Sequence, residues 1–172
     1  MISSFASLDS WFDRDEKFLS ERPDERWSAS QILEHVMLTN QYLLILIEKG
    51  TQRAKSIAKE KDFSDQLSQY AFETSALREV GIYKSFPWEN PEHMEPKGVR
   101  PLREIRKELR GQLHQCLCIL DSICNGEGVL YRITMTVNNL GKLDVYQYIY
   151  FLVLHVKRHI TQLEKREMEL TR

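Results

Sequence analysis

Two histidines four residues apart, His155 and His159, have the spacing that could support chemistry. In a helix this spacing puts both imidazoles on one face, one turn apart. A buried imidazole without a partner costs roughly 1–3 kcal/mol, and one divalent metal can satisfy two of them. The alternative is a pair of core histidines that hydrogen-bond to neighbouring groups. Burial is expected because the same face carries an apolar series: Val145, Tyr148, Leu152 and Leu163.

A third histidine, His35, lies on the inward face of another predicted helix. Ser28 and Gln31 form a capping-box pattern, which predicts that this helix begins just after residue 28. The helix is expected to end at Gly50, because glycine is common just past helix ends. His35 then shares an inward stripe with Ile32, Thr39, Tyr42 and Leu46.

The remaining histidines and the three cysteines do not extend this group. His93 falls in a loop and His114 has no partner on its own helix, so both are expected to be surface or structural residues. Cys116, Cys118 and Cys124 lack the CxxC spacing of redox and zinc motifs. We therefore expect small, unpaired cysteines in a reducing cytosol.

The composition indicates one globular domain over residues 1–172. Hydrophobic residues make up 42% of the chain and charged residues 28%, which is typical of a soluble protein. A net charge of −1 without a basic block argues against nucleic-acid binding. The N-terminus has no signal-peptide pattern, and the longest apolar run, residues 42–47, is too short to cross a membrane. A cytoplasmic protein is therefore expected.

Helices are the elements that must position the histidines. Asp144 and Gln147 form a second capping box, at the start of the helix that carries His155 and His159. Pro23 marks the end of the first helical segment. Hydrophobic periodicity predicts four main helical segments, over residues 2–20, 28–50, 101–124 and 142–165.

The segments between these helices are less regular. Residues 64–78 show a moderate amphipathic pattern, and residues 129–137 alternate like a short strand. Residues 84–101 form a long loop with four of the five prolines, so this loop is expected to be functional or a crossover. The predicted fold class is all-α, a four-helix bundle with a long proline-bearing crossover loop.

Three stretches of the chain carry a shared family pattern. Residues 27–36, WSASQILEHV, place a tryptophan before a helix start and a histidine within two turns. The loop contains HMEPKG, and residues 139–165 carry a glycine turn before a helix that ends in HxxxHxxQ. Together these stretches resemble the DinB-like (DinB/YfiT-like) metalloenzyme family. The resemblance implies a four-helix bundle with a metal at one end of its core, held by His35, His155 and His159.

The resemblance also implies a chemistry. Members of the family hold nickel, zinc or similar divalent ions, and some are transferases or isomerases that use low-molecular-weight thiols. Three imidazoles leave at least one coordination position open, as in catalytic zinc sites. We therefore expect a divalent-metal-dependent enzyme with zinc or nickel, or with iron or manganese. Its expected reaction is thiol transfer or hydrolysis on a small-molecule substrate, with a low-molecular-weight thiol as the expected co-substrate.

Other side chains could support the site. Gln162, one turn past His159, could orient the ligands from behind. Asn40 and Tyr42 are candidates to face the open position. The spacing points to no general base, because Glu34 is rotated about 100° around the helix from its neighbour His35.

A second hypothesis is a non-catalytic module that binds metal or packs against a helical partner, with a homodimer as one form. In that case a fourth protein ligand, such as Glu34 or His93, would close the metal site. An open coordination position would instead favour the enzyme. Neither hypothesis involves nucleic acid or a membrane.

Overall fold

The computed structural model describes residues 1–22 and 26–170 of the chain. Pro23, which was predicted to end the first helical segment, lies outside these residues. None of the helices in the described ranges combines the length and the apolar character needed to cross a bilayer. The elements in chain order are α1 (Ile2–Asp9), η1 (Ser10–Asp13), α2 (Glu16–Ser20), α3 (Ala29–Glu60), α4 (Ser64–Ser68), η2 (Arg78–Gly81), η3 (Glu92–Met94), α5 (Leu102–Ser122), η4 (Glu127–Leu130), β1 (Arg132–Met135), η5 (Val137–Asn139), β2 (Gly141–Asp144) and α6 (Val145–Leu170).

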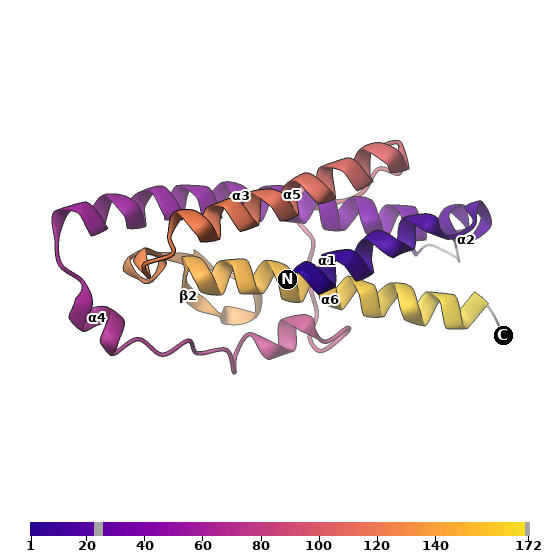
Figure 1. The fold of residues 1–172 in the computed structure, drawn as a ribbon. Helices are drawn as coiled ribbons and strands as arrows, with labels where there is room; N and C mark the ends of the chain where they lie inside the picture. Colours follow the sequence, from indigo (N-terminus) through magenta and orange to yellow (C-terminus); the bar gives the residue numbers. More distant parts are fainter. Residues whose placement is uncertain (23–25, 171–172) are drawn as a thin grey trace.

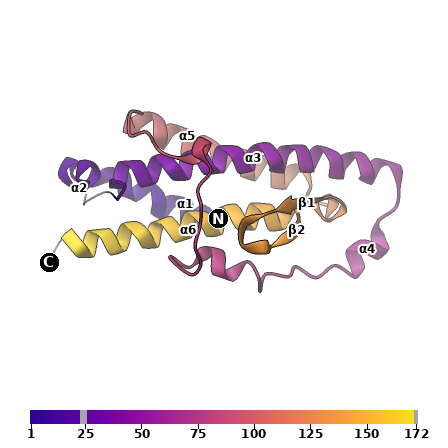
Figure 2. The ribbon, with the colours of Figure 1, turned by 180° about the vertical axis from the view of Figure 1, so that it is seen from behind.

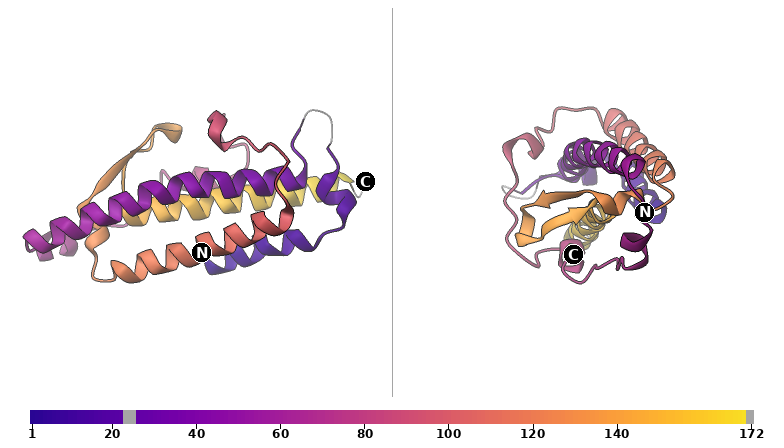
Figure 3. Two further views of the ribbon diagram at one scale, coloured as in Figure 1. Left: turned by 90° about the horizontal axis from the view of Figure 1, so that it is seen from above. Right: turned by 90° about the vertical axis from the view of Figure 1, so that its left-hand side faces the viewer.

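Four helices pack into a bundle, which confirms the predicted fold class (Figure 1). Helix α3 packs against α6 and α5, and α1 packs against α6 and α5 from the other side. The view from above shows α3 beside α6 and α5 beside α1 (Figure 3). Helices α3 and α6 run antiparallel, so the first turns of α3 lie beside the second half of α6. This arrangement brings His35 close to His155 and His159.

Capping boxes begin both helices that carry the histidines, as predicted. The Ser28 hydroxyl accepts from the Gln31 amide at 3.2 Å, and the Gln31 side chain accepts from the Ser28 amide at 3.0 Å. Asp144 and Gln147 make the same pair of bonds at 2.9 and 3.1 Å. Because each box satisfies amide groups that the first helical turn leaves free, the start of each helix is well defined.

The connection between α4 and α5 is the predicted crossover. Turn η2 lies against α6, and turn η3 lies against α3. Seen from behind, the chain passes across both helices before α5 begins (Figure 2). Residues 84–101 contain no helix apart from the turn η3, in agreement with the predicted loop. The loop therefore spans the two helices that carry the histidines.

Helix α3 does not end at Gly50 as predicted but continues to Glu60. A Cβ atom at position 50 would lie 2.6 Å from Ile133 Cδ1 and 3.3 Å from Val145 Cγ2. Glycine is required here by the close approach of the hairpin and of α6, and not by a helix end. Residues 64–78 also differ from the prediction, because only Ser64–Ser68 is helical.

The strand predicted within residues 129–137 is β1, but its partner β2 was not predicted. The two strands pair antiparallel, with Arg132 opposite Asp144 and Met135 opposite Gly141. Asn138 and Asn139 adopt left-handed φ values of 48° and 52° in the connection, a conformation that asparagine tolerates better than most residues. Residues 142–144, which were placed in the last predicted helical segment, therefore belong to a strand that leads directly into α6.

Asp144→Ala should destabilise the fold by about 1–2 kcal/mol, the usual cost of losing an N-cap. The substitution also removes the acceptor of the Tyr70 hydroxyl, which lies 2.8 Å from Asp144 Oδ2. The free energy of unfolding from urea denaturation measures the effect. Asp144→Asn is the control, because asparagine caps helices as well as aspartate does and should retain most of the stability. Equal losses in the two variants would contradict this role of the cap.

Candidate metal centre

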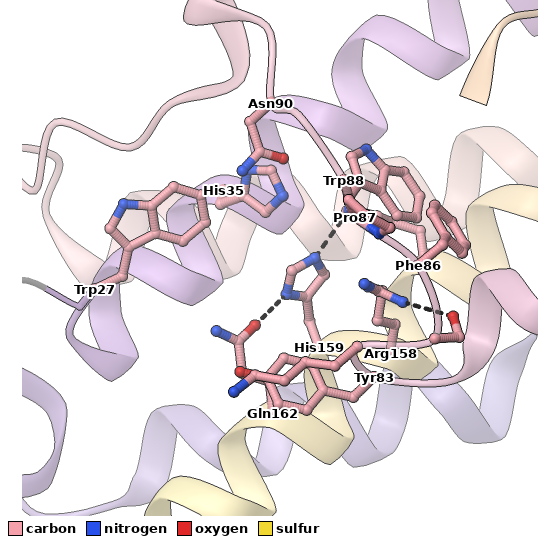
Figure 4. Close-up of a pocket in the computed structure, with 13 residues that line it drawn as sticks. Trp27, His35, Tyr83, Phe86, Pro87, Trp88, Asn90, Arg158, His159 and Gln162 are labelled. Atoms are coloured by element: carbon pink, nitrogen blue, oxygen red, sulfur yellow. Dashed lines mark hydrogen bonds between the residues drawn. The ribbon is translucent and has the colours of Figure 1, made fainter. Parts of the chain in front are cut away.

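The three histidines singled out in the sequence meet in the interior of the bundle, and Figure 4 shows two of them, His35 and His159. His35 comes from α3, His155 and His159 come from α6, and all three are buried. One ligand nitrogen from each ring lies within 4.8 Å of the other two. The ring centres are 4.5–5.3 Å apart. This separation is compatible with three imidazoles sharing one metal ion.

Hydrogen bonds orient two of the three rings. His35 Nδ1 lies 2.8 Å from the Met94 carbonyl oxygen, and His159 Nδ1 lies 2.8 Å from Gln162 Oε1. Both oxygens can only accept, so each Nδ1 carries the proton and each Nε2 presents a lone pair. Gln162 thus has the orienting position that the sequence predicted. An acceptor behind the ring is the usual way in which a protein fixes the tautomer of a metal-binding histidine.

The third ring, His155, is incompletely satisfied by the protein. Its Nε2 lies 3.0 Å from His159 Nε2, which already presents a lone pair, so a proton on His155 must bridge the two nitrogens. Within the described chain the buried His155 Nδ1 has no hydrogen-bond partner. An orphaned buried nitrogen of this kind costs roughly 1–3 kcal/mol. The donor set therefore fits a divalent metal, which can take neutral imidazole ligands from all three rings.

Burial keeps the three imidazoles uncharged. It lowers the pKa of His35 despite the opposing hydrogen bond to Met94. The pKa of His155 falls well below 6.5, first through burial and then through the neighbouring His159 and His35. Burial, followed by the charge of His35, lowers the pKa of His159 to about 3. All three rings are thus neutral at pH 7, and the neutral form is the one that binds metal.

A cavity of about 510 Å³ opens onto the three histidines. Trp27 lies against His35 with ring centres 4.8 Å apart, and Trp88 lies against His155 at 5.6 Å. None of the lining side chains in the described ranges, residues 1–22 and 26–170, is acidic. Its remaining lining comes mainly from the crossover loop and the second half of α6: Tyr83, Lys84, Ser85, Phe86, Pro87, Asn90, Arg158 and Gln162.

The crossover loop was predicted from the sequence, but its contacts with the site were not. It supplies the Met94 carbonyl to His35, and its Gly98 amide donates to the buried carboxylate of Glu34 at 2.7 Å. Gly98 has a φ of 70°, a left-handed value that favours glycine. The signals in the sequence were the clustered prolines and Trp88, but neither shows which helix face the loop will cover.

The other candidate residues lie away from the three rings. His93 is exposed, with its ring 4.9 Å from that of Tyr42. Neither Tyr42 nor Asn40 lines the histidine cavity, so the expectation that they face the open position was wrong. Glu34 is held by Gly98, as described above. Neither proposed fourth ligand, Glu34 or His93, belongs to the group of side chains that could hold the metal.

His114 and the cysteines also lie outside the site. His114 is exposed, with Nε2 3.6 Å from the Sγ atom of Cys118. Cys116 is buried and burial raises the pKa of its thiol to about 11, whereas Cys118 and Cys124 are exposed. All three are unpaired, as the sequence predicted.

Comparison with known proteins gives one match. A family model described as the DinB superfamily matches residues 6–163. The match spans all three histidines and agrees with the family resemblance of the sequence. No curated protein and no solved structure matches the chain.

Acid should destabilise the metal-free protein. The pKa of His159 is about 3 in the folded protein and near 6.5 in the unfolded chain, so below pH 6.5 the unfolded chain binds more protons. Between pH 7.5 and pH 5 this residue alone should lower the free energy of unfolding by about 2 kcal/mol. Urea unfolding of chelator-treated protein at the two pH values measures the change.

His159→Gln should remove most of the decrease in the free energy of unfolding that His159 causes between pH 7.5 and pH 5. His114→Gln, which changes an exposed histidine, should leave that decrease unchanged. A free energy of unfolding that is equal at both pH values in the unmodified protein would contradict neutral burial of the three rings.

Proposed function

The chain belongs to the DinB superfamily, and on this premise we propose that it is a divalent-metal-dependent enzyme. The observation that carries the proposal is the convergence of three buried imidazoles on one cavity. His35, His155 and His159 would hold the metal. Zinc or nickel suits such an all-imidazole set, with iron or manganese as alternatives.

The open cavity supports an enzyme over a closed structural site. Three protein ligands leave a coordination position for water or substrate, and neither Glu34 nor His93 is placed to fill it. A metal bound there would lower the pKa of a coordinated water, or would hold a thiol as its thiolate. A cavity of about 510 Å³ has the size of a small-molecule site.

The residues around the cavity favour thiol transfer over hydrolysis. Hydrolysis commonly uses a general base to remove a proton from water, and no carboxylate of the described part of the chain lines the cavity. A metal-bound thiolate is already deprotonated and needs no such base. Trp27 and Trp88 lie against His35 and His155 and give the cavity apolar walls beside the rings. The proposed reaction is therefore the transfer of a low-molecular-weight thiol to a small electrophile, with hydrolysis as the second option.

His159→Ala should abolish stoichiometric metal binding. The variant loses one of three ligands and the ring that shares a proton with His155. We expect about one zinc or nickel ion per chain in untagged protein after metal titration and dialysis, measured by elemental analysis. His114→Ala removes an exposed histidine and should keep the full content. Equal metal content in the two variants would place the ion elsewhere.

Gln162→Leu should weaken metal binding by about 10- to 100-fold, the usual effect of losing the group that orients a metal ligand. The Gln162 oxygen accepts from His159 Nδ1 at 2.8 Å, and leucine cannot accept. Competition with a chromophoric chelator measures the affinity. Gln162→Glu keeps an acceptor at this position and should retain most of the affinity. If Gln162→Leu binds metal as tightly as the unmodified protein, Gln162 does not orient His159.

A further inference from the structure

Arg158 is a buried cation that the proposed chemistry does not yet use. It neighbours His159 on α6, and only 7% of its surface is exposed. The guanidinium carbon lies 5.2 Å from the ring centre of Phe86 and 5.1 Å from that of Trp88. Its Nη1 donates to the Ile82 carbonyl and, at 3.3 Å, to the Ser85 hydroxyl. These contacts hold the guanidinium in one orientation at the wall of the histidine cavity (Figure 4).

The other edge of this guanidinium has no protein partner. Within the described part of the chain, Arg158 Nε and Nη2 make no hydrogen bond, and no carboxylate forms an ion pair with this side chain. Elsewhere in the fold, Arg106 and Arg110 use the same edge of the guanidinium to bind a carboxylate. Each directs Nε and Nη2 to the two carboxylate oxygens of Asp9, at 2.7–3.0 Å.

An unpaired buried charge is unfavourable, since desolvation is not offset by an opposite charge. Among the residues that the structure describes, the charged side chains lining the cavity are Arg158 and Lys84, and no acidic side chain lines it. A divalent metal on the histidines would add positive charge. Such a field favours an anionic ligand and raises its concentration at the mouth of the cavity.

We propose that the small molecule bound in this cavity carries a carboxylate, and that Arg158 binds it through Nε and Nη2. The planar carboxylate matches this pair of donors and forms two parallel hydrogen bonds. Trp88 contacts both Arg158 and His155, and all three side chains line the same cavity. One small molecule can then present its carboxylate to Arg158 and its reacting group to the histidines. This inference rests on the proposed function, since it names the ligand class of the same site.

Mercaptobutyrate and its amide, mercaptobutyramide, test the proposal on the cobalt-loaded protein. Both carry the same thiol, and the thiolate-to-cobalt absorption band reports binding without any need for turnover. The unmodified protein should bind the acid about 10- to 100-fold more tightly than the amide, as expected for a charged, two-point hydrogen bond. Equal affinities would overturn the proposal.

Two variants test whether Arg158 causes the preference for the acid over the amide. Arg158→Gln should remove it, and Arg158→Lys, which keeps the charge but not the paired donors, should lose most of it. Lys157→Gln is the matched control, because it removes one positive charge from an exposed side chain at the preceding position. The ratio of acid to amide affinity is compared between proteins, so differences in thiol acidity cancel. A ratio that survives in Arg158→Gln would overturn the assignment.

A second measurement separates this inference from the proposed function. If neither thiol gives a cobalt band, the proposed thiol chemistry fails. Arg158 is then tested in metal-free protein, with phenylpropionate and phenylpropionamide titrated by calorimetry. Binding of the acid alone, lost in Arg158→Gln, would support the carboxylate site even without the metal chemistry. Equal binding of acid and amide, or no binding of either, would overturn it.

Discussion

The burial of three uncharged imidazoles against one another is the constraint on which the rest of the structure depends. Each ring must give up water, and the loss of hydration lowers all three pKa values. The hydrogen bonds that His35 and His159 donate to Met94 and Gln162 fix these two rings, so their lone pairs face inward. Helices α3 and α6 run antiparallel, and each begins with a capping box. Together these features set the position along the bundle axis at which the three rings meet. A metal would take the lone pairs of the three rings in place of the contact between His155 Nε2 and His159 Nε2 at 3.0 Å.

The crossover loop turns this pair of helices into a binding site. Along its length it contacts His35, Glu34 and His155 through Met94, Gly98 and Trp88. The same loop orients the Arg158 guanidinium, whose free edge remains at the cavity wall. Arg106 and Arg110, by contrast, are both paired with Asp9.

The sequence by itself determined the features that depend on local spacing. Helical periodicity places His155 and His159 one turn apart on a single buried face, whatever the rest of the chain does. The capping boxes at Ser28 and Asp144 satisfy backbone groups within their own first turn, so the starts of both helices could be read directly. Four amphipathic segments and little strand pattern were enough for the bundle, and the family resemblance added His35 to the pair.

Tertiary structure alone decided what depends on contacts between distant segments. Gly50 looks like a helix end, but Ile133 and Val145 pack against it and α3 continues. Strand β2 exists because β1 offers it hydrogen bonds, which its own short sequence does not encode. The path of the loop over α3 and α6, and with it the cavity and the free edge of Arg158, follows from packing across long chain separations. Local spacing carries no information about such contacts, because their stabilisation comes from burial after the chain has folded.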